Sequence, residues 1–222
     1  QKDWKGPAGE AIKSELASSV PGLPQAEPSL KITYVQPKDF TGLLRYVRNI
    51  LVVTIDPTAY TKVSVGYENN VWARGQVVVS LKAPNTESIV EYSKTHEKAL
   101  VNFFVKVEMN RAIEQLQKEY SMVVMDNLKS DLNVMLNAPA NFTYYKDTTD
   151  FFWSSNNANT GRMDLIVYTF PYTDPNTFTE EYLVAKRDSV LKANLPGSFP
   201  GSYMQTETRA GVEYTPITLN GK

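Results

Sequence analysis

The sequence has no cysteine and only one histidine, and these absences exclude several kinds of site. Without thiols the chain can form no disulfide, no thiolate nucleophile and no cysteine-ligated zinc or iron–sulfur centre. His96 leaves no partner for a two-histidine metal site and no evident Ser-His-Asp arrangement. We therefore expect no metal and no cofactor, and we interpret His96 as a surface residue where two helical segments meet.

An excess of charge of either sign is also lacking. Lys and Arg number 23 against 24 Asp and Glu, which gives a formal net charge of -1. No overall field attracts phosphate backbones, so we expect no nucleic-acid partner. The longest apolar runs, such as Ile50 to Val53, are far shorter than the roughly 20 residues of a membrane-crossing helix. The first residues contain no apolar segment of a secretory signal, so such a signal is either absent or precedes Gln1.

Apolar residues make up 42% of the 222 residues, enough for one large domain or two small ones. The pattern predicts an α+β fold, a two-layer sandwich of helices on a mixed, largely antiparallel sheet. Residues 1–120 alternate strands and helices and end in a long helix, whereas residues 121–222 have a more antiparallel character. We expect these two subdomains to form one compact unit.

In the first subdomain the continuous β-branched run 49–55 is typical of a central strand buried on both faces. The other expected elements are a helix at 9–19, a strand at 30–35, a helix at 38–47, strands at 62–67 and 76–81, and a helix that begins with Thr86 as N-cap.

The strongest periodicity lies between residues 97 and 119. An apolar stripe with helical spacing predicts a long helix that lies across the sheet, and its main members are Leu100, Phe103, Phe104 and Val107. Arg111 interrupts this stripe, so its charge needs a partner or access to water. Glu108 could pair with Arg111 or with the loop that carries Arg48, and we favour a buried structural ion pair.

In the second subdomain the pattern predicts strands at 133–136, 142–146, 151–155 and 163–170, and a helix at 179–191. An extended segment at 211–219 leads into Asn220-Gly221, which is typical of a two-residue hairpin turn. Only Lys222 follows. We therefore expect the native chain to continue beyond this residue, the alternative being a frayed tail.

Acidic residues are the only candidates for catalysis, because glycoside hydrolysis needs two carboxylates that face each other across a cleft. The candidates are Asp147, Asp150, Asp164, Asp174, Glu180 and Glu181. Most of them lie in turns or helix starts, where capping and the helix dipole already favour acids. No glycine spacing resembles a phosphate-binding loop. We assign no catalytic residue.

Aromatic and arginine residues in the second half suggest a binding surface. The candidates are Trp153, Arg162, Tyr172 and Arg187, accompanied by Tyr168 and Phe178. Trp, Tyr and Arg are enriched at recognition surfaces because they offer a large contact area with few rotatable bonds. The structural alternative is that residues 151–153 belong to the core and that Arg187 with Asp188 covers a helix face.

Several motifs along the whole chain carry a resemblance to a known family. They are Trp4-Lys5-Gly6-Pro7-Ala8-Gly9, the segment 20–28, Arg48-Asn49-Ile50, Glu108-Met109-Asn110-Arg111, Phe151-Phe152-Trp153, Thr160-Gly161-Arg162, Pro171-Tyr172-Thr173 and Lys186-Arg187-Asp188-Ser189. The chain resembles an uncharacterised domain-of-unknown-function family of predicted Bacteroidetes lipoproteins. This resemblance implies an exported protein with a lipidated N-terminal cysteine, tethered in the periplasm or at the outer membrane. It implies further chain before Gln1 and after Lys222, but it supplies no activity, ligand or catalytic residue.

Three functional hypotheses follow. The first is a non-catalytic cell-envelope module that binds an envelope protein, a peptide or a glycan and reaches the membrane only through the inferred lipid anchor. The second is a carboxylate-dependent hydrolase of envelope polymers, which requires two acids about 5–10 Å apart in a concave site. The third is a purely structural role in a larger lipoprotein assembly.

Overall fold

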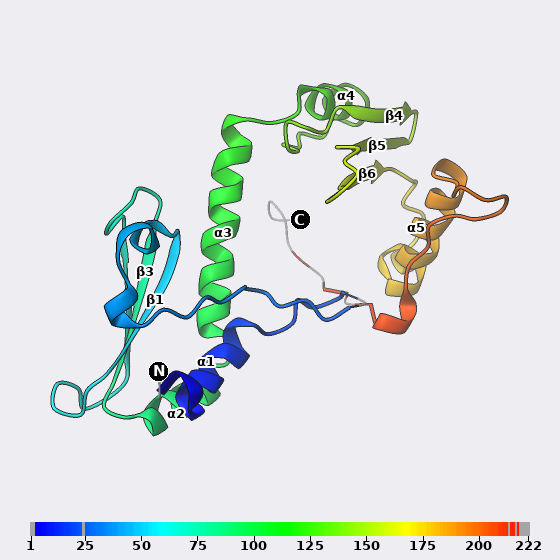
Figure 1. Ribbon diagram of the computed structural model, residues 1–222. Coiled ribbons are helices and arrows are strands. Elements are labelled where there is room, and N and C mark those ends of the chain that lie inside the picture. The colour runs from blue at the N-terminus through cyan, green and yellow to red at the C-terminus, as the bar shows by residue number, and fades with distance from the viewer. Residues whose placement is uncertain (1–2, 24, 213, 216, 218–222) are drawn as a thin grey trace. The chain divides into compact units, whose positions relative to one another are not determined.

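The computed structural model describes residues 3–23, 25–212, 214–215 and 217. The chain divides into two compact units, Gln1–Met109 and Asn110–Lys222, and each unit has its own sheet of three strands (Figure 1). The mixed α+β class expected from the sequence is confirmed. In the described part of the chain no helix is both long and apolar enough to cross a membrane.

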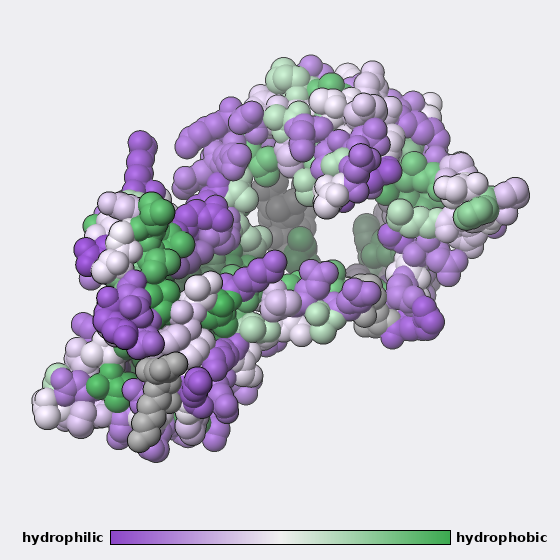
Figure 2. All heavy atoms as spheres, viewed as in Figure 1, coloured by the Kyte–Doolittle hydropathy of each residue, from purple (hydrophilic) through white to green (hydrophobic). Residues whose placement is uncertain are grey.

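The sheet of the N-terminal unit contains β1 (Asn49–Ile55), β2 (Ser64–Asn69) and β3 (Val77–Ala83). β3 lies in the middle, parallel to β1 and antiparallel to β2. The prediction that residues 49–55 form a central strand was therefore wrong. Val52 and Val53 of β1 are 37% and 39% exposed, whereas Val77, Val78 and Val79 of β3 are buried on both faces. Figure 2 shows hydrophobic residues reaching the surface over these strands.

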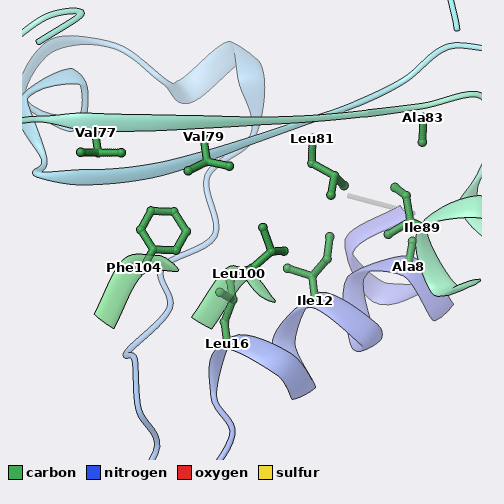
Figure 3. Packing of buried hydrophobic residues seen from close by; sticks show 10 residues of the cluster. All are labelled: Ala8, Ile12, Leu16, Val77, Val79, Leu81, Ala83, Ile89, Leu100 and Phe104. Carbon is green, nitrogen blue, oxygen red and sulfur yellow. The ribbon is translucent and has the colours of Figure 1, made fainter. Parts of the chain in front are cut away.

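The helices of this unit pack on one face of its sheet. They are α1 (Pro7–Leu16), α2 (Thr86–Thr95) and the first half of α3 (Ala99–Lys118). Figure 3 shows the side chains of β3 pointing at those of the helices; the buried cluster comprises Ala8, Ile12, Leu16, Val77, Val79, Leu81, Ala83, Ile89, Leu100 and Phe104. Phe103 and Val107 pack against it, so the predicted stripe of α3 does face the sheet.

Three local predictions in this unit were wrong. Residues 30–35 form no strand, and residues 38–47 form short 3₁₀ helices, η2 (Pro37–Asp39) and η3 (Gly42–Tyr46), in place of an α-helix. Gly42 has a φ of 54°, which breaks the helical path, and Leu43 is 87% exposed, so its apolar spacing is not a core-facing stripe. The N-cap of α2 is Asn85, whose side chain accepts the N–H of Ser88 at 2.8 Å, and not Thr86.

The ion pair expected at Glu108 exists, but it is not buried. Glu108 Oε2 lies 3.6 Å from Arg48 Nη2, and the two side chains are 32% and 72% exposed. Glu108 Oε1 also accepts a hydrogen bond from Asn49 Nδ2 at 2.6 Å. The pair therefore links α3 to the start of β1 at the surface, where water screens much of its charge.

The described part of the C-terminal unit has an antiparallel sheet of three strands and two α-helices. Its elements are α4 (Met122–Leu132), β4 (Tyr144–Thr148), β5 (Phe151–Ser155), β6 (Asp164–Tyr168) and α5 (Glu180–Asn194), with β5 in the middle. The sequence did not predict α4. The strand predicted at 133–136 is absent because Asn133 adopts a left-handed conformation that ends α4. The hairpin turn predicted at Asn220-Gly221 lies outside the described residues.

Different faces of this sheet contact α4 and α5. Val124 and Leu128 of α4 pack against Phe152 of β5. On the face of Phe151 and Trp153, Lys146 Nζ of β4 donates a hydrogen bond to the carbonyl oxygen of Asn194 in α5 at 2.9 Å. This middle strand is therefore fixed from both sides, and the residues beside it have defined positions.

Candidate recognition surface

The structure brings two of the four candidate residues into contact with each other. Trp153 lies on β5 and Arg162 lies in the turn before β6, and the guanidinium carbon of Arg162 is 5.9 Å from the centre of the Trp153 ring. Arg187 lies on α5 and Tyr172 follows β6, and both take part in other contacts. The contact between Trp153 and Arg162 is the strongest structural support for the candidate binding surface.

Asp164 holds this contact in place. Its carboxylate accepts hydrogen bonds from Trp153 Nε1 at 3.0 Å, from Arg162 Nη2 at 3.0 Å and from Arg162 Nε at 3.1 Å. We call Trp153, Arg162 and Asp164 the aromatic–arginine cluster. Burial alone would raise the pKa of Asp164, but the hydrogen bonds from Arg162, Trp153 and Ser155 outweigh it and lower the pKa below its ordinary value of 3.8.

The sheet register explains why these side chains meet. Trp153 is paired with Ile166 of β6, and Asp164 lies two residues earlier on the same face of the sheet. In the turn before β6, Gly161 adopts a φ of 67°, a conformation that favours glycine. Arg162 follows directly, and its guanidinium group reaches the Asp164 carboxylate. The guanidinium side chain remains 51% exposed. It is a planar group of fixed orientation that still faces solvent, which suits recognition of planar or anionic groups.

Arg187 has a different role. Its Nη1 donates to Thr206 Oγ1 at 2.8 Å and lies 3.1 Å from Asp188 Oδ1. Asp188 Oδ1 also accepts the backbone N–H of Thr206 at 2.9 Å. These bonds fasten the segment after α5 to that helix. Burial raises the pKa of the nearby Tyr168, Arg187 opposes this shift and Asp188 adds to it.

Tyr172 stacks on Phe178 of the short helix η4 (Pro175–Phe178). The ring centres are 5.4 Å apart, and the two residues are 62% and 58% exposed. An exposed aromatic pair is a common feature of interaction surfaces. The described contacts do not join this pair to the aromatic–arginine cluster.

Three of the six candidate acids, Asp147, Asp164 and Asp174, take part in structural contacts. Asp174 caps η4 by accepting the N–H of Asn176 at 2.7 Å, and Asp164 holds Arg162. Asp147 pairs with Asp131 of α4, a residue that the sequence analysis missed because the partner lies on another element. Burial first and then Asp131 raise the pKa of Asp147, while hydrogen bonds from Ser130 and then Asp147 lower that of Asp131.

The described contacts join none of the six candidate acids to another of the six. Asp147 interacts with Asp131, which is not one of the six, and the described contacts place no cleft between these two carboxyl groups of the kind that glycosidase carboxylates face across. Among the described residues no group of three or more His, Asp or Glu could hold a metal ion. A hydrolase site therefore gains no support from these contacts.

The N-terminal unit contains an apolar cavity that the sequence analysis did not predict. It has a volume of about 140 Å³ and is lined by Val65, Gly66, Tyr67, Val79, Tyr92, Ala99, Leu100 and Phe103. The lining contains no charged side chain. Tyr67 and Phe103 form one wall, with ring centres 5.0 Å apart. Sequence spacing could not reveal this cavity because it depends on which strand becomes outermost.

Comparison with known proteins identifies two consecutive domains. Residues 1–117 match the family model described as Domain of unknown function (DUF8532), and residues 121–222 match the one described as Domain of unknown function (DUF4837). No curated protein and no solved structure matches the chain. The first match covers more than half of the sequence, and the chain therefore belongs to the DUF8532 family.

Proposed function

We propose that this chain is a non-catalytic recognition module of the bacterial cell envelope. It binds an envelope protein, a peptide or a glycan through the aromatic–arginine cluster, and a lipid on an N-terminal cysteine tethers the full-length protein. The resemblance to predicted Bacteroidetes lipoproteins supports the location. The arrangement around Trp153 supports the binding role.

One observation carries the binding role: Arg162 lies over the Trp153 ring and is held there by Asp164, yet half of its side chain faces solvent. An arginine in a fixed orientation loses less conformational entropy when it binds a ligand than a free one does. A surface salt bridge alone contributes little to stability, so stability gives a weak reason for this arrangement. Recognition is the better explanation.

Affinity capture from envelope extract tests the binding role. The full chain, Trp153→Ala and Arg162→Ala are immobilised in turn, and recovered proteins and glycans are quantified by mass spectrometry. We expect each variant to lose at least about tenfold in recovery of the specific partner, as hot-spot residues do. Equal recovery by wild type and both variants would reject the surface.

The matched control is Arg209→Ala. Arg209 also pairs with a neighbouring acid, Glu207, and its side chain is largely exposed, but the described contacts place no aromatic ring beneath it. We expect this variant to recover the partner as wild type does. Circular dichroism of all variants separates loss of binding from loss of folding.

The envelope location has its own test. The full-length protein is expressed in its native host, and membrane and soluble fractions are compared before and after mutation of the cysteine that would carry the lipid. We expect the protein to move from the membrane to the soluble fraction. Membrane association that survives loss of this cysteine would contradict lipid tethering.

A further inference from the structure

In the described part of the chain no strand pairs with the outer edge of β2, and the hydrogen-bonding groups of this edge can be assigned. The N–H of Asn70 donates to the carbonyl of Gln76 at 2.8 Å. Because backbone groups alternate in direction along a strand, the N–H and C=O groups of the even-numbered residues of β3 point towards β2. Val77 instead donates to Arg48, and the carbonyl of Ala83 accepts from Asp56, on the side of β1. In an antiparallel ladder this alternation directs the N–H and C=O groups of Val65, Tyr67 and Asn69 away from the sheet.

The same residues border the apolar cavity. Val65 and Tyr67 line it with side chains that point to the helical face of the sheet, while Tyr92 and Phe103 line it from α2 and α3. All six residues of β2 are exposed. Outward backbone groups therefore lie next to a space of about 140 Å³, which can hold one aliphatic side chain.

The other face of β2 carries an exposed carboxylate. Glu68 is paired across the sheet with Val78, so its nearest neighbour on β3 offers no positive charge. A strand added on the free side would place a side chain beside Glu68 at cross-strand distance, and opposite charges at such positions stabilise strand pairing. The edge thus favours a partner with apolar residues on one face and a basic residue on the other.

We propose that the free edge of β2 binds an extended peptide as an additional strand. Its backbone pairs with Val65, Tyr67 and Asn69, an aliphatic side chain enters the cavity, and a Lys or Arg side chain on the opposite face meets Glu68. Main-chain hydrogen bonds supply affinity and the cavity supplies specificity, as in other cases of β-strand addition.

A second copy of this chain fits the edge less well. Antiparallel pairing of two β2 strands would bring Val65 and Tyr67 of each copy together, and these side chains already lie against the walls of their own cavity. Neither copy would then have an aliphatic side chain free to fill the other cavity. A separate peptide brings such a side chain.

The probe is the blocked peptide acetyl-Thr-Leu-Lys-Val-Thr-Leu-Thr-amide, titrated into the ¹⁵N-labelled full chain. We expect the amide signals of Val65, Tyr67 and Asn69 to shift and their hydrogen exchange to slow at least about tenfold. The same peptide with N-methyl groups on its three apolar residues cannot donate to the edge and should bind at least tenfold more weakly. Equal binding of the methylated peptide would overturn the proposal.

Variants locate the site. Val65→Pro removes one outward N–H without breaking a bond to β3, so it should weaken binding at least tenfold, whereas Val65→Ala keeps the N–H and serves as the control. Ala99→Phe fills the cavity and should also weaken binding. Trp153→Ala should bind the peptide as wild type does, so this test is independent of the aromatic–arginine cluster.

Three results would reject edge pairing: no binding of the probe peptide, shifts that map to other residues, or equal affinity of Val65→Pro and Val65→Ala. Sedimentation velocity provides a further check on the free protein. A dimer that Val65→Pro dissociates would show that a second copy occupies the edge and would also overturn the proposal.

Discussion

Both units place one strand between two others, but they bury this middle strand in different ways. β3 of the N-terminal unit buries aliphatic residues and no aromatic one, and three helices cover one face of its sheet. β5 of the C-terminal unit buries Phe151 and Phe152 on opposite faces; α4 packs against Phe152, and Lys146, which bonds to α5, lies beside the Phe151 ring. The buried cluster around Phe152 has five members, against ten in the N-terminal unit.

This difference shows how side-chain size decides which surface stays open. Two large aromatic residues stabilise a short strand without many partners. At the polar end of β5 the buried hydroxyl groups of Ser154 and Ser155 donate hydrogen bonds to the carbonyl oxygens of Tyr144 and Met163. Trp153 and Arg162 can then remain at the surface. In the N-terminal unit the helices cover only part of the sheet, and the backbone edge of β2 stays open.

The largest expected effect tests the dependence on single aromatic residues. Phe152→Ala leaves a cavity between β5 and α4 and should lower the free energy of unfolding by about 3–5 kcal/mol. Phe178→Ala, at an exposed position, should cost about 1 kcal/mol or less. Urea unfolding measures both, and similar costs for the two variants would break the comparison.

A smaller effect tests the close packing of helices in the N-terminal unit. A methyl group at Gly9 of α1 would collide with the backbone of Trp4, so Gly9→Ala should destabilise by about 1–3 kcal/mol, although Ala normally favours a helix. Gly66→Ala, where a methyl group meets open space, is the control. If Gly9→Ala proved as stable as wild type in thermal unfolding, the assigned contact would be incorrect.

Glu15 allows a test by pH. Its carboxylate accepts the N–H of Leu100 at 2.7 Å, but burial raises its pKa above the ordinary 4.5 despite this bond. The folded state therefore binds the proton more tightly than the unfolded state, and this residue's contribution to stability falls as pH rises from 4.5 through the raised pKa. Glu15→Gln should gain stability relative to wild type across that window. A constant difference from pH 4 to 8 would contradict this.

The smallest effect concerns the aromatic–arginine cluster. Arg162→Ala should lower stability by only about 0.2–1 kcal/mol, because the pair with Asp164 is exposed. The pKa of Asp164 is lowered, so its contribution is present above pH 3.8 and disappears as pH falls through the folded pKa. Urea unfolding at low salt should show a smaller loss at pH 2.5 than at pH 7. A loss of several kcal/mol would indicate a structural role in place of recognition.

Local pattern was sufficient for some elements. The spacing of Leu100 and Phe104 predicted α3, and the aromatic run from Phe151 predicted β5, because both patterns depend on periodicity within one segment. The position of β1 could not be predicted in this way, since which strand lies in the middle is decided by pairing. Strand-favouring residues such as Val123 and Val124 hid α4, whose N-cap Ser121 was not recognised.

Residue type identified part of the candidate surface. Trp153 and Arg162 were found because Trp and Arg are enriched at interfaces, but the role of Asp164 came only with the register of β5 and β6. The hydrogen bond from Arg187 to Thr206 depends on the path by which the chain after α5 returns to that helix. The sequence around either residue does not predict this path. The free edge of β2 likewise follows from pairing alone.

Residue-resolved hydrogen exchange of the free full chain tests the central claim most directly: each unit fixes the backbone of its middle strand and leaves recognition groups exposed, the β2 edge in one unit and the side chains of the aromatic–arginine cluster in the other. We expect slow exchange of the backbone amides that bond within the sheets, including Val77 and those of β5, and fast exchange at Val65 and Tyr67. Slow exchange at Val65 and Tyr67 in the free protein, or fast exchange throughout β5, would contradict the account.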